Sequence, residues 1–419
     1  MKIYHNTLPH LLLYTSPKKT THKEIFGRMS RPTVTSSFPA TVAVALAVVQ
    51  LVILIVPSTV VEARTKTIPA DSSKLDEWIA HNMREYNDRK GNETGVKALD
   101  RRLAKAEDGV RLIIVRKDGR GNFTTITKAI ESIPSGNRRR VVVWIGGGIY
   151  REKITIEASK PFVTLYGQKG KRPMITFDAT ASEFGTVKSA TVAVESDYFV
   201  AVNLAFVNSA PMPELGGTGG QAVAMRISGD KAAFHECHFI GFQDTLCDDR
   251  GRHFFKDCYI QGTVDFIFGN GKSLYLKTTI NSVAEGTGVI TAQAREEATD
   301  DSGFTFAYCN ITGTGNTYLG RAWKERTRVV FAYTYMGNLI NTEGWSDKMH
   351  GSKPRKSMYY GEYKCMGPGA TPLGRVNYAR ILSDEEAKAF LSMTYIQGNK
   401  WLLPPPDLSF SRSQPNFFH

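Results

Sequence analysis

The sequence predicts an all-β chain that folds as a parallel β-helix, and three observations lead to this prediction. From Arg111 onward, short segments rich in Val, Ile, Tyr and Phe are separated by Gly, Asp, Asn or Pro, a pattern typical of many short strands. Imperfect units of about twenty residues recur, and such units bury their apolar faces only by stacking on one another. Hairpin turns of the Asn-Gly kind, which a β-sandwich needs between most strands, are rare here, so the β-sandwich is the weaker alternative.

The first 63 residues hold an apolar run behind a longer N-terminal extension. Residues 40–56 are apolar except for Thr41 and Gln50, which is long for a signal-peptide core and short for a membrane span. Val61-Glu62-Ala63 follows as a candidate cleavage site. We therefore expect a cleaved secretory signal in residues 1–63 and a mature N-terminus near Arg64, with an uncleaved signal anchor as the alternative.

Composition narrows the partner classes. With 42% apolar and 22% charged residues the chain is an ordinary globular protein, and its formal charge of +13 suits an acidic partner. No Lys/Arg-rich run or aromatic RNA-binding motif is present, so we expect no nucleic acid, and an acidic polysaccharide or a negatively charged matrix fits the charge equally well. Three Asn-x-Ser/Thr sequons, at Asn92, Asn122 and Asn310, agree with secretion and glycosylation.

The chain divides into segments of different amino-acid composition. Residues 64–109 form a polar lead-in in which LDEWIAHNMREY predicts a short amphipathic helix. The strand-rich part spans residues 110–405, and TTITKAIESIP near its start predicts a helix that caps the end of the strand stack. Residues 406–419 are a C-terminal tail.

The clearest repeat places an aromatic residue three positions before a cysteine and an apolar residue two positions after it. It occurs in FHECHFIG (234–241), FFKDCYIQG (254–262) and FAYCNITG (306–313). We expect Cys237 and Cys258 to stack in the interior as buried, reduced thiols, because side chains that project side by side give poor disulfide torsion. Cys309 should repeat this pattern. The odd count of five cysteines without a CxxC argues against a disulfide scaffold and a zinc site.

The same alignment superposes two carboxylates. An offset of 21 residues aligns Cys237 with Cys258 and also aligns Asp244, in QDTL, with Asp265, in VDFIF. Equivalent positions on adjacent coils lie about 4.8 Å apart, so one carboxyl pKa should rise while the other stays low. Such a split separates a proton donor from a nucleophile or base. The alternative is two unrelated, exposed loop aspartates that cap turns.

Polar residues of other types accompany this pair. Gln221 opens QAVAMR, Gln243 precedes Asp244, and LGRAW contains Arg321 and Trp323. Amide groups can donate hydrogen bonds to an oxyanion, a guanidinium can clamp a carboxylate, and an indole offers a flat face to a sugar ring. Singly, each has an ordinary explanation as a surface amide, a salt-bridge partner or a core residue.

Together these motifs, in this order, closely resemble the plant pectinesterases (pectin methylesterases). The likeness runs from about Val110 to Leu402 and also includes GIYREK, GNFTTITKAIESIP, SATVAV, YGEYKCMGPGA and YIQGNKWL. It implies a right-handed parallel β-helix, a single-stranded solenoid with short helices at the ends. It also implies hydrolysis of the C6 methyl esters of homogalacturonan without a metal or organic cofactor. The lead-in is short and lacks cysteines, so it is not the inhibitor-like pro-region of many relatives.

The resemblance further implies catalytic roles. Asp265 would be the nucleophile and Asp244 the general acid, later the base. Gln221 and Gln243 would stabilise the oxyanion, and Arg321 would orient Asp265.

Substrate contacts are implied by the same resemblance. Thr191, in SATVAV, and Trp323 match positions that contact substrate in the family, and Gln221 and Arg321 would share that task. Cys247 stands where many relatives carry an aromatic residue that lines the cleft, which puts one sugar contact in doubt.

Three competing functions fit a β-helix. A pectate lyase needs a calcium-binding carboxylate cluster, and a polygalacturonase needs carboxylates set farther apart, with a water between them. A catalytically inactive pectin-binding wall protein is the third alternative. We expect a secreted, monomeric cell-wall enzyme that acts on methyl-esterified pectin and is a target for a proteinaceous inhibitor.

Overall fold

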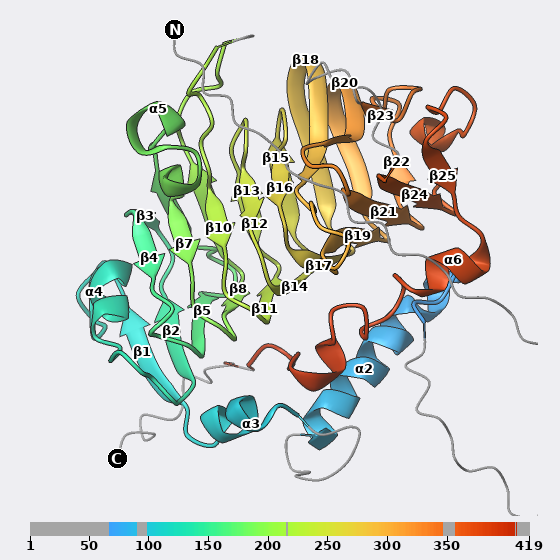
Figure 1. Ribbon diagram of the computed structural model, residues 1–419. Coiled ribbons are helices and arrows are strands. Elements are labelled where there is room, and N and C mark those ends of the chain that lie inside the picture. The colour runs from blue at the N-terminus through green and yellow to red at the C-terminus, as the bar shows by residue number, and fades with distance from the viewer. Residues whose placement is uncertain (1–66, 90–98, 215–216, 347–356, 407, 409–419) are drawn as a thin grey trace, which may run out of the picture. The chain divides into compact units, whose positions relative to one another are not determined.

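The computed structural model describes residues 67–89, 99–214, 217–346, 357–406 and 408, all within one compact unit, Thr65–His419 (Figure 1). The predicted signal segment and the sequon at Asn92 lie outside the described residues. Asn122 and Asn310 are both exposed. In the described part of the chain, no helix is long and apolar enough to cross a membrane.

The described strands stack, parallel and in register, into faces that wind about one axis. The first face consists of β1 (Arg111–Val115), β2 (Val141–Ile145), β5 (Val163–Gly167), β8 (Val200–Val202), β11 (Ala232–His235), β14 (Arg252–Lys256), β17 (Lys272–Leu276), β19 (Gly303–Ala307), β21 (Arg328–Ala332), β24 (Tyr359–Tyr363) and β25 (Ala379–Ile381). The second consists of β3 (Ile149–Arg151), β6 (Met174–Phe177), β9 (Ala205–Asn208), β12 (His238–Ile240), β15 (Tyr259–Gly262) and β22 (Tyr335–Met336). The third consists of β4 (Ile154–Ile156), β7 (Val192–Val194), β10 (Met225–Ile227), β13 (Leu246–Asp248), β16 (Ile267–Gly269) and β23 (Trp345–Ser346). The strands β18 (Thr279–Gln293) and β20 (Asn310–Ala322) are longer because each runs through the corner and joins the second face to the third.

This arrangement confirms the predicted right-handed parallel β-helix. The repeated aromatic positions form one stack through its interior: Phe234, Phe255, Tyr275, Phe306 and Phe331 have successive ring centroids 4.8, 4.4, 4.5 and 4.5 Å apart. All five side chains are buried. Burying each such side chain stabilises the fold by about 1.5–3 kcal/mol.

The cysteine prediction is also confirmed. Cys237, Cys258 and Cys309 are free thiols buried in the interior core. The amide of the residue after Cys258 donates to the carbonyl of Cys237 (2.9 Å), so adjacent coils are aligned at this position. The preceding residues, Glu236 and Asp257, both have φ of 53°, a left-handed corner that turns the chain from one face to the next.

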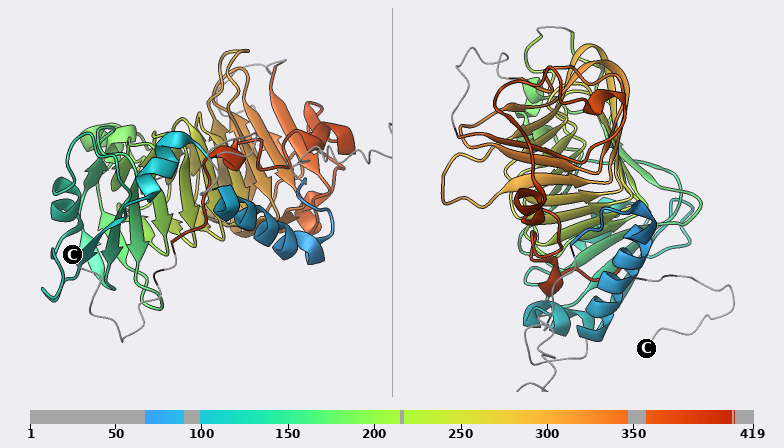
Figure 2. Two further views of the ribbon diagram at one scale, coloured as in Figure 1. Left: turned by 90° about the horizontal axis from the view of Figure 1, so that it is seen from below. Right: turned by 90° about the vertical axis from the view of Figure 1, so that its right-hand side faces the viewer.

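Short helices and one longer helix surround the stack of strands. They are η1 (Ser72–Lys74), α2 (Leu75–Arg89), α3 (Arg101–Glu107), α4 (Ile126–Glu131), α5 (Ala181–Phe184), η2 (Val187–Ser189), η4 (Pro368–Ala370), α6 (Asp384–Lys388) and η5 (Gly398–Lys400). As predicted, α4 closes the N-terminal end, and its apolar side joins the interior core. The longest helix, α2, contains the lead-in segment LDEWIAHNMREY that was predicted to be helical, and it lies along the outer side of the first face (Figure 2).

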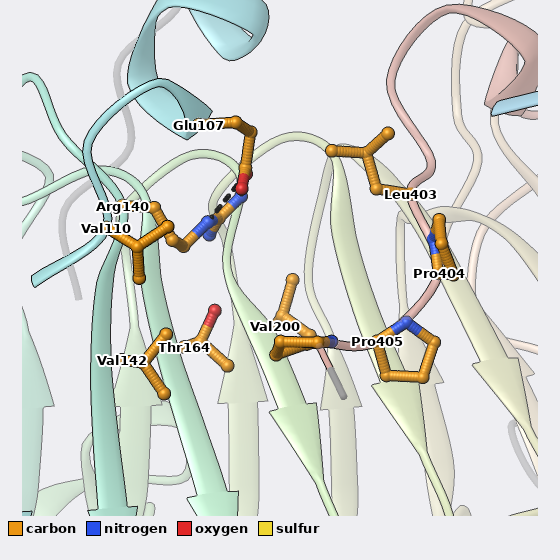
Figure 3. A pocket seen from close by; sticks show the side chains of 10 residues that line it. Glu107, Val110, Arg140, Val142, Thr164, Val200, Leu403, Pro404 and Pro405 are labelled. Atoms are coloured by element: carbon orange, nitrogen blue, oxygen red, sulfur yellow. Dashed lines mark hydrogen bonds and ion pairs between the residues drawn. The ribbon is translucent and has the colours of Figure 1, made fainter. Parts of the chain in front are cut away.

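The C-terminal segment crosses this same outer side near the lead-in. Arg140 forms a buried ion pair with Glu107 at 2.8 Å and donates to the carbonyl of Tyr198. Together with Leu403 and Pro405, this pair lines a cavity of about 400 Å³ (Figure 3). The lead-in and the C-terminal segment are therefore packed parts of the β-helix unit.

A charged network is buried inside the helix. The carboxylate of Asp248 contacts His253 Nδ1 at 2.5 Å and accepts from the Tyr275 hydroxyl at 2.6 Å, while His253 Nε2 lies 2.9 Å from the carbonyl of Gly229. Asp248, His253 and Tyr275 are all fully buried. Burial alone lowers the pKa of His253, but the charge and hydrogen bond of Asp248 outweigh it and raise that pKa above 6.5.

Replacing His253 should therefore change stability in a pH-dependent way. His253→Gln should cost about 3 kcal/mol of unfolding free energy at pH 6, because the Asp248 carboxylate loses its buried partner. The stability that protonated His253 contributes is fully present below pH 6.5 and is lost as pH rises through its raised folded-state pKa. Denaturant unfolding of both proteins should show the difference narrowing with rising pH.

Tyr275→Phe is the matched control, because it removes a hydrogen bond to the same carboxylate without removing the histidine. It should lower stability by about 1–2 kcal/mol, with little pH dependence between pH 6 and 9. A His253→Gln difference that stays constant with pH would contradict the assignment.

Candidate active site

Asp244 and Asp265 lie one above the other at the turn between the second and third faces. The amide of Asp244 donates to the carbonyl of Val264 at 3.1 Å, and Leu246 pairs with Ile267 two residues farther along. Both aspartates have left-handed φ values, 64° and 52°, which Asp tolerates better than most residues. The predicted juxtaposition is confirmed: the two carboxylates occupy equivalent places on neighbouring coils.

The turn that carries Asp265 requires a glycine before it. A Cβ at Gly262 would lie 2.2 Å from Phe266 Cβ and 2.6 Å from the carbonyl of Phe242. Phe266 is fully buried, so the turn is anchored in the core directly beside Asp265.

Arg321 forms a multidentate ion pair with Asp265. Its Nε lies 2.7 Å from Oδ1 and 2.9 Å from Oδ2, and its Nη2 lies 2.5 Å from Oδ2. Arg321 is near the end of β20. It pairs in register with Ala292 of β18, so it lies one coil beyond Ala292 on the third face. A planar guanidinium that engages both carboxylate oxygens fixes the orientation of Asp265.

Asp244 has a different environment. It is 8% exposed, and burial raises the pKa of its carboxyl well above 3.8. The charge of Asp265 raises this pKa further, and the charge of Arg321 opposes the rise only in part. Asp244 is therefore the protonated member of the pair to a higher pH than an exposed aspartate.

These residues line a cavity of about 280 Å³. Its walls are Thr186, Val187, Gln221, Gln243, Asp244, Asp265, Phe268, Ala292, Arg321 and Trp323. Gln221 precedes β10 and Gln243 precedes β13, so both amides come from the same corner as the carboxylates. Among the described residues, neither amide side chain is bonded to another protein group, and both can therefore donate to a bound molecule.

Thr191, for which the family resemblance implies a contact with substrate, is not among the residues that line this cavity. Thr191 is fully buried, and its hydroxyl donates to the carbonyl of Val207 at 2.9 Å. Thr186 and Val187, only a few residues earlier in GTVKSATVAV, form the wall instead.

Phe268 also lines the cavity, although the sequence motifs did not predict it as a site residue. It packs against Trp323 with ring centroids 5.9 Å apart, and Trp323 is 39% exposed at the rim. Phe268 pairs in register with Cys247, which is buried among small apolar side chains of the third face. The repeat could have indicated Phe268. Phe268 follows Asp265 by three residues, Cys247 follows Asp244 by three residues, and both positions point outward.

This arrangement can carry out acyl transfer. It sets a carboxyl with a raised pKa and an ion-paired carboxylate beside two amide donors, with an aromatic rim for an apolar or sugar face. In the described part of the chain, His, Cys, Asp and Glu side chains nowhere gather in a group of three or more that could hold a metal ion.

Comparisons with known proteins bear on this site. A family model described as Pectinesterase matches residues 112–399. "Probable pectinesterase 50" of Arabidopsis thaliana is 46% identical over 364 residues, covering 87% of this chain and 99% of its own length. "Putative pectinesterase 63" of the same plant is 55% identical over 293 residues, covering 70% and 86%. The solved pectin methylesterase from carrot aligns with a TM-score of 0.66 at 32% identity over 70% of this chain and 97% of its own. A pectin methylesterase solved in complex with a hexasaccharide aligns at 0.61 and 28% identity over 70% and 98%.

The pKa of Asp244 should respond in opposite directions to two substitutions. Asp265→Asn should lower it, because a neighbouring negative charge is removed, yet burial should keep it above 3.8. Arg321→Gln should raise it, because the opposing positive charge is lost. Titration of the Asp244 carboxyl by isotope-edited infrared spectroscopy would measure both shifts. Shifts of the same sign would show that the three groups do not interact as described.

Proposed function

The chain belongs to the pectinesterase family, and from this premise we propose that it hydrolyses the C6 methyl esters of homogalacturonan to free carboxylates and methanol. It is a carboxylic ester hydrolase. The observation that carries the proposal is the asymmetry of the stacked pair: Asp244 has a raised pKa, while Arg321 holds both oxygens of Asp265.

In the proposed first half-reaction, Asp265 is the nucleophile. A carboxylate oxygen of Asp265 bonds to the C6 carbonyl carbon, and the carbonyl oxygen becomes an oxyanion that the amides of Gln221 and Gln243 stabilise. Protonated Asp244 gives its proton to the departing methoxy oxygen as the C6–O bond breaks. Methanol leaves, and an anhydride joins C6 to Asp265.

The second half-reaction restores both residues. Asp244, now ionised, takes a proton from water as the water oxygen bonds to C6. The bond between C6 and Asp265 then breaks, which frees the product acid and returns Asp265 to Arg321. Because the proton ends on Asp244, the pair is ready for the next ester.

Substrate binding and location follow from the same proposal. Trp323 and Phe268 supply the apolar surface for a sugar ring, and Gln221 and Arg321 border the reacting unit. The enzyme acts outside the cell, on wall pectin, where its basic surface meets an acidic polysaccharide. It acts as a monomer without a cofactor, and a proteinaceous inhibitor can bind it.

Methanol release tests the proposal directly. The purified protein should release methanol from methylated pectin without producing the double-bond absorbance of a lyase or the new reducing ends of a polygalacturonase. Asp265→Asn should reduce the rate by about 10⁴-fold or more, because an amide is not a nucleophile. Asp244→Asn should also be severely impaired, since methoxide is a poor leaving group without a proton.

Melting curves are the control for folding. Asp244→Asn should melt no lower than the unmodified protein above neutral pH, because the amide avoids the ionisation of a buried carboxyl. Wild-type turnover in Asp265→Asn would end the nucleophile assignment. An unmodified protein that binds pectin but releases no methanol would instead support the inactive wall-binding alternative.

The two glutamines should each contribute to the rate but not to the fold. Gln221→Ala or Gln243→Ala should reduce kcat by about 10²–10³-fold, the usual effect of removing one oxyanion donor. Steady-state kinetics on methylated pectin would measure this effect, with Gln168→Ala, outside the cavity, as the matched control. A change in KM alone would indicate that the amides bind the ground state rather than the oxyanion.

A further inference from the structure

A second cavity continues the reaction cavity on the side of Gln243. Its volume is about 590 Å³, and Gln243 lines both cavities. Thr263 and Val264, which also line it, immediately precede Asp265 in the same turn. A polymer with one unit at Asp265 therefore has room to place a neighbouring unit here.

The charge of this second cavity differs from that of the chain as a whole. Its described walls hold two carboxylates, Glu214 and Glu285, and no basic side chain. Both glutamates are exposed, and among the described residues neither forms an ion pair with a lysine or arginine. In a protein with a formal charge of +13, this is a local negative field beside the reaction centre.

The backbone fixes where both glutamates stand. Between Val283 and Thr287 the pairing of β18 with β20 shifts register, so Glu285 leaves the ladder at the rim, where β18 and β20 rise above their neighbours (Figure 1). The carbonyl of Glu214 accepts a hydrogen bond from the amide of Gly217 at 3.0 Å.

The other walls complement an uncharged ester. Met212, Pro213, Val264 and Ala284 present apolar groups that can contact a methyl ester. A free galacturonate in the same place brings a carboxylate toward two others, and the described walls of the cavity hold no basic side chain to compensate.

We propose that Glu214 and Glu285 make this side of the cleft selective for pectin units that still carry their methyl ester. This inference rests on the proposed function and adds a determinant of substrate pattern to it. A unit already de-esterified is disfavoured beyond Gln243, so the charge of the product restricts the direction in which the polymer can advance.

The test compares Glu214→Gln/Glu285→Gln with the unmodified enzyme on highly esterified pectin and on the same pectin after random alkaline de-esterification. The kcat/KM on highly esterified pectin should stay within twofold, because neither glutamate contacts the reacting ester. The kcat/KM on the de-esterified substrate should rise about fivefold, the size expected for partly exposed charges, and the gain should shrink in about 0.5 M salt. Glu131→Gln/Glu157→Gln makes the same charge change at exposed sites outside both cavities and should leave the ratio unchanged.

A binding measurement separates this inference from the proposed function. In an Asp265→Asn background, the two glutamine substitutions should tighten binding of unesterified oligogalacturonate about fivefold and leave binding of its fully esterified form unchanged. An unaltered preference in both measurements, or an equal shift in the control, would overturn the inference. Absence of methanol release by the unmodified enzyme would overturn the proposed function, while the binding measurement would still decide the charge selectivity.

Discussion

Parallel hydrogen bonding between successive coils, in one fixed register, is the constraint on which the other features depend. It places chemically equivalent residues directly above one another, as the amide of Asp244 and the carbonyl of Val264 illustrate. In the interior, this register converts a repeated aromatic position into a continuous stack and a repeated cysteine into buried thiols. At the corner between two faces, this register places two buried carboxylates next to each other, where water screens their charges poorly.

The site resolves this like-charge contact by giving the two carboxyls unequal neighbours. Arg321 reaches Asp265 from a coil farther along, and the guanidinium engages both of its oxygens. Asp244 has no comparable partner among the described residues, and its pKa rises. The contact between the two carboxyls is electrostatically unfavourable. Packing of the surrounding core, which includes the buried Phe266, holds the two residues in place.

Two charged networks lie buried in the described part of the interior, and in each the carboxylate has charged and neutral partners. Asp248 contacts both His253 and Tyr275, and Glu362 near the C-terminal end receives Arg375 and the indole of Trp345. These networks replace water within a core that is otherwise aromatic and aliphatic. The exposed glutamates of the second cavity contrast with them, because their charges are directed toward the cleft and not toward a partner.

The sequence by itself determined the fold class, the buried thiols and the stacking of Asp244 on Asp265, because a repeat with a constant offset fixes register wherever coils are parallel. Family likeness added the expected roles of Gln221, Gln243 and Arg321, and the structure gathers these residues around one cavity. Only the tertiary structure decided that Thr186 rather than Thr191 borders the cavity and that α2 lies along an outer side. The first feature depends on which side of a short strand is covered, and the second depends on which outer surface the lead-in packs against. Both are set by contacts between segments far apart in the sequence, which no local pattern records.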